Sequence, residues 1–196
     1  MHYSNASVKA PNTSVNTIAF NLGLNYALDD TEPEYLKTVV KEKFTEPVKF
    51  NLVFRSGVNE DDVINSGQHP FYVFSAYADK RISKYSAFQL GTEVFFSEFL
   101  KDYIKYKSIS FPEEGIKGDE DYKRVGMFIG HELFINKFSL VAQYGYYIYY
   151  PVDFEGKTYI RVGLKYYLNN KLFTAVSLKT HAANAEAVEF GLGYRF

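Results

Sequence analysis

The chain has 196 residues, which is enough for one domain with a sizeable core. Its formal net charge of −1 lacks the basic excess of nucleic-acid-binding proteins, so we expect no nucleic-acid partner. The absence of cysteine excludes a disulfide framework and a cysteine-ligated metal site. The sequence has no stretch of about 18 apolar residues that could cross a bilayer as a helix.

Aromatic residues are unusually frequent. Tyrosine and phenylalanine number 18 each and together make up 18% of the chain, while tryptophan is absent. Membrane β-barrels carry girdles of aromatic side chains at both interfaces, which would explain this composition. The composition therefore favours a barrel over an ordinary soluble domain.

Period-2 alternation of apolar and polar residues, the pattern of strands with two different faces, recurs along the chain. In residues 17–28, one face carries Ile18, Phe20, Leu22, Leu24, Tyr26 and Leu28. The same pattern predicts strands over residues 48–58, 70–79, 85–98, 123–135, 138–150, 157–168, 172–181 and 187–196. Strands of about ten residues have the length that a tilted strand needs to cross a bilayer.

The connections between these strands alternate between short and long, as in outer-membrane barrels. Short turns are predicted at Asp79-Lys80-Arg81, Asn136-Lys137 and Asn169-Asn170. Residues 99–122 are predicted to form a long polar loop on the outer side. Residues 29–46 form a long connection on the periplasmic side, which could hold a short helix around residues 35–43.

The last strand is the most informative. Its outward face carries Phe196, Tyr194, Leu192, Phe190 and Val188, and its inward face carries Arg195, Gly193, Gly191 and Glu189. A terminal phenylalanine preceded by apolar residues at every second position resembles the signal that the barrel-assembly machinery binds. We therefore expect that machinery as a partner; the alternative is an edge strand of a soluble sandwich.

The direction of each strand follows from a periplasmic C-terminus. Counting back, residues 17–28 run inward, residues 1–16 lie at the outer rim, and residues 1–8 end an outward strand. This gives about ten strand positions, the first truncated, in an all-β antiparallel outer-membrane barrel. We expect residues 1–196 to form one transmembrane domain of a Gram-negative outer membrane, a C-terminal portion lacking its N-terminal strands and signal peptide.

A nucleophile and a base lie close together near the start. On a strand, His2 and Ser4 are two residues apart and point the same way, so their side chains can approach each other. Serine becomes a nucleophile beside a base, and the imidazole needs a third group to orient it. Pro11-Asn12 marks a turn, after which Asn16 could accept the imidazole N–H.

The longer string H-Y-S-N-A-x-x-K-x-P-N-x-x-x-N closely resembles the active-site segment of the outer-membrane lipid A 3-O-deacylases, or acyloxyacyl hydrolases. The resemblance implies that His2 is the general base and Ser4 the nucleophile. It implies that Asn5, Ala6 and Asn12 belong to the oxyanion and substrate region. The acidic member of the family's triad, usually glutamate, falls on Asn16, which is a departure because an amide cannot offset the imidazolium charge.

The resemblance implies hydrolysis of an ester-linked 3-hydroxyacyl chain of lipid A in the outer leaflet, with no metal and no organic cofactor. Lipid A, or lipopolysaccharide, and outer-membrane lipids would be its partners. Two alternatives remain at this point: a non-catalytic barrel, porin-like or structural, and a soluble barrel that binds apolar ligands.

Charged residues on the inward faces of the predicted strands are expected to form an internal network rather than a pore. These residues are Lys49, Arg55, Glu93, Arg161 and Lys165. His181 is interpreted as a residue of an outer loop, beside Asn184 and Glu186.

Overall fold

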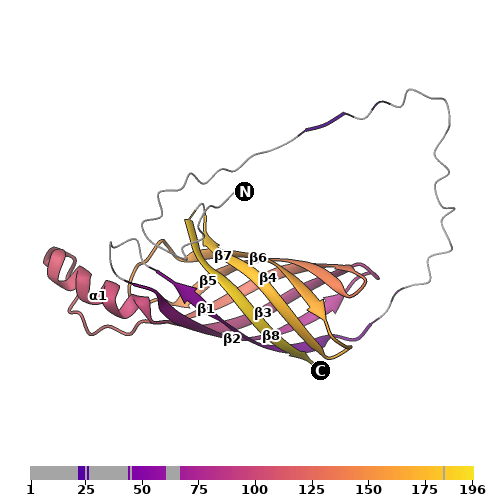
Figure 1. Cartoon of the computed structure of the whole chain (residues 1–196), viewed down its shortest axis with the longest axis horizontal. Helices are drawn as coiled ribbons and strands as arrows, with labels where there is room; N and C mark the ends of the chain where they lie inside the picture. The colour runs from indigo at the N-terminus through magenta and orange to yellow at the C-terminus, as the bar shows by residue number, and fades with distance from the viewer. Residues whose placement is uncertain (1–21, 25, 27–43, 45, 61–66, 183) are drawn as a thin grey trace.

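The computed structural model describes residues 22–24, 26, 44, 46–60, 67–182 and 184–196, and these contain a closed antiparallel barrel. Each strand pairs with the next, and β8 pairs with β1 (Figure 1). The strands are β1 (Lys49–Asn59), β2 (His69–Arg81), β3 (Ser86–Ser97), β4 (Lys123–Ile135), β5 (Phe138–Tyr149), β6 (Thr158–Tyr167), β7 (Leu172–His181) and β8 (Asn184–Arg195). The all-β barrel prediction is confirmed, and β4 and β7 have the predicted bounds.

The predicted strand count is wrong for this barrel, which closes over eight strands instead of nine or ten. β1 pairs with β2 along one edge and with β8 along the other, from Asn51↔Arg195 to Ser56↔Phe190. Residues 17–28 are therefore not one of its strands, and the barrel has no unpaired edge. Of that segment, the structure describes residues 22–24 and 26, which are exposed and outside any strand.

Two further predictions about the N-terminal part concern residues outside the described part of the chain. These are the strand end at residues 1–8 and the helix around residues 35–43. The single-domain assignment of residues 1–196 likewise stays a prediction.

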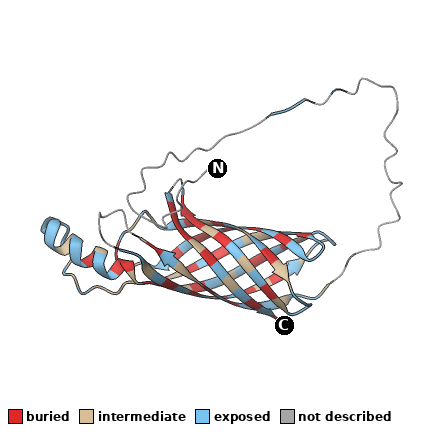
Figure 2. Ribbon diagram, viewed as in Figure 1, coloured by how far each residue is buried: buried red, intermediate tan, exposed pale blue. Residues whose placement is uncertain are grey.

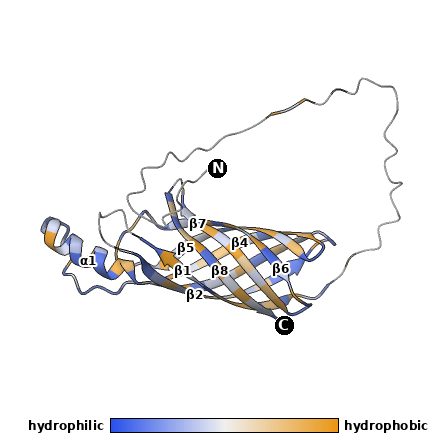
Figure 3. Cartoon of the chain, viewed as in Figure 1, coloured by the Kyte–Doolittle hydropathy of each residue, from blue (hydrophilic) through white to orange (hydrophobic). Residues whose placement is uncertain are grey.

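The two faces of the barrel wall differ sharply. Buried and exposed residues alternate along every strand, as Figure 2 shows, and the exposed positions are mostly apolar (Figure 3). In β2, for example, Ser75 and Asp79 are buried inside, while Tyr72 and Phe74 are exposed outside. An apolar outer band around a polar interior is the arrangement of membrane-spanning barrels. Within the described residues, no helix is long and apolar enough to cross a membrane.

The two ends of the barrel differ in their connections. At one end, which we call the short-turn end, residues 82–85, 136–137 and 168–171 join the strands, and Phe196 ends the chain. Asn136 adopts φ 58°, the left-handed conformation that a two-residue hairpin turn requires. The Asn169 side-chain oxygen accepts hydrogen bonds from the backbone N–H groups of Lys171 and Leu172.

The opposite end, which we call the long-loop end, carries residues 60–68, 98–122 and 150–157. The long polar loop predicted at 99–122 contains the helix α1 (Phe99–Ser110) and the short 3-10 helix η1 (Pro112–Glu114). The helix buries Phe99, Leu100 and Ile104, and the Phe99 ring packs on Phe154 of the loop at 150–157, while Lys101 and Lys105 are exposed. It projects from the long-loop end (Figure 1).

Candidate functional site

All of the predicted catalytic and substrate residues lie outside the described residues. They are His2, Ser4, Asn5, Ala6, Asn12 and Asn16. Their roles stay predictions.

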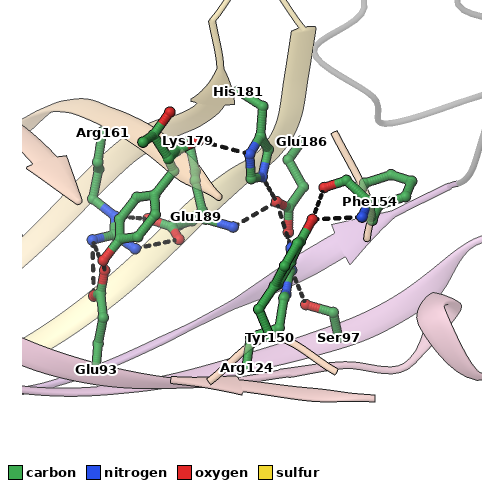
Figure 4. A network of polar contacts seen from close by, with 12 residues as sticks. Glu93, Ser97, Arg124, Tyr150, Phe154, Arg161, Lys179, His181, Glu186 and Glu189 are labelled. Carbon is green, nitrogen blue, oxygen red and sulfur yellow. Dashed lines mark hydrogen bonds and ion pairs between the residues drawn. The ribbon is translucent and has the colours of Figure 1, made fainter. Parts of the chain in front are cut away.

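The centre of the barrel interior is an ion-pair network. Arg161 lies between two carboxylates, with its Nη1 2.8 Å from Glu93 Oε1 and its Nε 2.6 Å from Glu189 Oε2 (Figure 4). Tyr159 donates a hydrogen bond of 2.5 Å to Glu93, and Arg55 lies 3.6 Å from the same carboxylate. These groups are almost wholly shielded from solvent, so each charge is compensated where it is buried.

A second cluster fills the long-loop end of the interior. Glu186 accepts hydrogen bonds from Arg124 Nη1 at 3.2 Å and from Lys179 Nζ at 2.5 Å, and it also contacts His181 Nε2 (Figure 4). The other ring nitrogen of His181 lies 3.0 Å from the Thr158 carbonyl oxygen. His181 is only 3% exposed at the end of β7, so its interpretation as a loop residue is wrong.

Sequence reasoning missed Glu186 because of an irregularity in strand pairing. Strict alternation back from Phe196 turns Glu186 outward. The β7–β8 register shifts between Lys179 and Thr180, so that Ala185, Glu186 and Ala187 are all buried. An extra residue of this kind redirects side chains at a strand end. In the sequence, the one indication of this cluster was that His181, Asn184 and Glu186 lie close together near the β7–β8 turn.

Aromatic side chains of the loop at 150–157 and of α1 cover this cluster on the side of the long-loop end. The Phe154 ring lies 6.5 Å from His181 and 5.1 Å from both Phe99 and Tyr103 of α1. The Tyr150 hydroxyl accepts a hydrogen bond of 2.5 Å from Phe154 N–H and donates to the Phe154 carbonyl (Figure 4). Burial raises the pKa of the Tyr150 hydroxyl above its ordinary value, so this group stays neutral.

The short-turn end of the interior is also filled. Glu132 accepts hydrogen bonds from Lys165 Nζ at 2.7 Å and from the Tyr167 hydroxyl at 2.7 Å. Asp79 pairs with Arg195. The expected lumenal positions of Arg55, Glu93, Arg161 and Lys165 are confirmed, whereas Lys49 lies at the rim beside Glu46. An eight-stranded barrel is just wide enough to be filled by side chains, and this one is a packed scaffold.

The outer wall carries two apolar grooves across β1, β2 and β3. One has a volume of about 500 Å³ and lies between Phe54, Phe74, Val94 and Leu192. The other, of about 480 Å³, lies between Phe50, Leu90, Met127 and Phe196. Leu52, Ala76 and Thr92 line both grooves. Among the described residues, no group of three or more His, Asp or Glu side chains could hold a metal ion.

Two family models match different parts of the chain. The model described as "Acyloxyacyl hydrolase, C-terminal domain" matches residues 48–196, which include the whole barrel. The model described as "Lipid A 3-O-deacylase (PagL)" matches residues 1–25, which include every predicted site residue. No curated protein matches the chain.

One solved structure that is similar to this chain is described as "De novo design of transmembrane beta-barrels". It shares 11% sequence identity at a TM-score of 0.43, over 80% of this chain and 100% of that chain. The first family model covers well over half of the sequence. Both models are described as enzymes that remove ester-linked acyl chains. The chain therefore belongs to the acyloxyacyl hydrolase family, and its function is that of a lipid A 3-O-deacylase, a hydrolase of ester bonds in lipid A.

Proposed function

We propose that the reaction uses Ser4 as the nucleophile, His2 as the general base and Asn16 as the group that orients the imidazole. The observation that carries this proposal is the match of the lipid A 3-O-deacylase model to residues 1–25, which contain all three.

The proposed reaction has two steps. Ser4 Oγ attacks the carbonyl carbon of an ester-linked 3-hydroxyacyl chain while His2 takes the hydroxyl proton. Asn5, Ala6 and Asn12 supply the region that stabilises the oxyanion. The C–O bond to the sugar then breaks, the sugar oxygen receives the proton from His2, and water hydrolyses the acyl-serine to release the hydroxy fatty acid and restore Ser4.

We place the protein in the outer membrane of a Gram-negative bacterium, with the short-turn end in the periplasm. Short periplasmic turns and longer outer loops are the rule for such barrels. Strand β8 ends at Arg195, followed by Phe196, at the short-turn end, where the barrel-assembly machinery would engage it.

A channel function is not favoured by the described interior. Six buried cationic side chains, those of Arg55, Arg124, Arg161, Lys165, Lys179 and Arg195, occupy it together with the carboxylates of Asp79, Glu93, Glu132, Glu186 and Glu189. Phe154 covers the long-loop end of this interior. Ions would have to displace these paired groups, which costs several kcal/mol per buried charge.

Mass spectrometry of lipid A tests the proposal. Gram-negative cells expressing the protein should lose the mass of one ester-linked 3-hydroxyacyl chain, and cells expressing Ser4→Ala should keep it. Heat-dependent mobility on gels, the usual assay for a folded barrel, should be the same for both proteins. Unchanged lipid A in both strains, with folded protein in the outer membrane, would refute the assignment of Ser4. Equal deacylation by both would mean that another residue is the nucleophile.

A further inference from the structure

The short-turn end of the barrel carries an excess of positive charge. The connections there and the strand ends beside them contain Lys49, Lys80, Arg81, Lys84, Lys137 and Lys171. Among the described residues of this rim, the one acidic side chain outside the interior is that of Glu46, which pairs with Lys49 and Arg81. By contrast, residues 98–122 at the long-loop end contain seven acidic residues and four lysines. The charge is therefore asymmetric between the two ends.

Four exposed lysines, Lys80, Lys84, Lys137 and Lys171, form what we call the basic collar. Lys80 and Lys84 flank the β2–β3 turn, Lys137 lies in the β4–β5 turn, and Lys171 lies in the β6–β7 turn. No ion pair joins any of them to a carboxylate of the described residues; Lys80 donates to the backbone carbonyl of Glu46. The collar therefore runs around the rim instead of forming a patch on one side.

A belt of exposed aromatic side chains lies next to the collar on the outer wall. Tyr85 follows Lys84, Phe138 follows Lys137, and Phe50 and Phe196 lie side by side where β1 meets the chain end. Aromatic side chains at such positions mark the boundary between hydrocarbon and headgroups. The collar lysines thus project to the depth of the lipid phosphates.

A polar pair on the outer wall supports this depth. Ser86 Oγ lies 2.6 Å from His131 Nε2, and the two residues alternate with the buried Ala87 and Glu132, so they point outward. The pair lies beside Phe88, whose ring is 5.5 Å from His131. Polar side chains are costly in hydrocarbon and favourable among lipid headgroups. The headgroup region of the membrane therefore extends to Ser86 on β3 and His131 on β4.

We infer that the basic collar binds the phosphate groups of anionic phospholipids in the leaflet at the short-turn end. A lysine ammonium is a compact charge on a flexible stem that suits a laterally mobile phosphate. Juxtamembrane lysines attract anionic lipid by on the order of fivefold each. This inference depends on membrane insertion of the barrel and is independent of the proposed chemistry of Ser4.

The chain itself contains a competing anion, the acidic run Asp29, Asp30, Glu32 and Glu34. A stretch of six residues spans at most about 20 Å. The rim of an eight-stranded barrel has a perimeter of roughly 50 Å, from strand spacing and tilt. That run cannot reach all three basic turns at once, whereas a ring of lipids can.

Electron paramagnetic resonance of spin-labelled lipids measures the selectivity directly. The full chain is reconstituted in phosphatidylcholine bilayers, and the immobilised fraction is compared for labelled phosphatidylglycerol and labelled phosphatidylcholine. We expect a severalfold preference for phosphatidylglycerol at low salt that falls towards unity at about 1 M salt. Replacing Lys80, Lys84, Lys137 and Lys171 with glutamine should abolish the preference.

The matched control replaces four exposed lysines of the long-loop end, Lys101, Lys105, Lys117 and Lys157, with glutamine. It has the same change in net charge and should keep the preference. If the collar variant does not fold, the double variants Lys80→Gln/Lys84→Gln and Lys137→Gln/Lys171→Gln should each lose part of it. Equal binding of both lipids by the wild type would overturn the inference. A preference that appears only after amide substitution of Asp29, Asp30, Glu32 and Glu34 would identify that run as the occupant instead.

Discussion

Asn16 is the residue at which the proposed catalytic group departs from the family pattern, where glutamate is usual. An amide oxygen can hold the imidazole of His2 in one orientation. It cannot offset the positive charge that the imidazole gains when it takes the proton of Ser4. The departure therefore affects the transition state more than the binding of substrate.

We predict that Asn16→Glu increases kcat for ester hydrolysis by about tenfold or more, because a carboxylate stabilises the imidazolium. KM should change little, since the proposed role of this residue is to orient His2 and not to bind the acyl chain. Hydrolysis of a short chromogenic ester by the detergent-solubilised protein measures both constants. Asn16→Ala is the matched comparison and should lower kcat. A fall in kcat for Asn16→Glu would show that Asn16 does not fill the acidic position.

The interior charges show how far single residues could be predicted from the sequence. Arg55, Glu93, Arg161 and Lys165 were placed correctly because regular alternation fixes the face of each side chain. Glu186 was not, because the local shift in β7–β8 register breaks the alternation where the charge cluster forms. His2, Ser4 and Asn16 lie outside the described residues, so their positions stay predictions.

At the scale of elements, the strands were predictable and the helix was not. A barrel strand contacts two different environments, so its sequence alternates over its full length, and all eight strands were found within a few residues. Helix α1 buries Phe99, Leu100 and Ile104 but exposes Tyr106 and Ile109, so its sequence has no clear apolar face. Its packing against the loop at 150–157 is tertiary and cannot be derived from local pattern.

On the inward face of the barrel, glycines of one strand leave space for aromatic rings of the neighbouring strand. A Cβ atom added at Gly145 of β5 would lie 2.0 Å from Cζ of Tyr159 on β6. The Tyr159 ring needs this space to reach Glu93 across the interior. The glycine is therefore a packing requirement of the central ion-pair network.

We predict that Gly145→Val destabilises the barrel by about 1–3 kcal/mol, because the Tyr159 ring must move away from Glu93. Urea unfolding in lipid vesicles, followed by gel mobility or circular dichroism, measures the change; the chain has no tryptophan for fluorescence. Ala142→Val, on the outward face of the same strand, should have little effect. Equal stability of the two variants would contradict this packing argument.

At the scale of the whole molecule, the alternation pattern could not predict where the barrel closes. The pattern assigns residues 17–28 and 48–58 to strands with equal justification, because both alternate. The barrel closes where β1 pairs with β8. Alternation within a strand does not show which other strand it pairs with. The strand count was wrong for that reason, although the fold class was right.

Because every strand of the barrel has two partners, we predict that residues 44–196 fold without residues 1–43. The shortened chain keeps Glu46, which ties Lys49 and Arg81 together at the short-turn end. It should show heat-dependent gel mobility and a β-rich circular dichroism spectrum in lipid, with a urea midpoint close to that of the full chain. It should also lack deacylase activity, since it lacks His2, Ser4 and Asn16. A shortened chain that aggregates while the full chain folds would mean that residues 1–43 contribute to barrel closure, against the strand pairing described above.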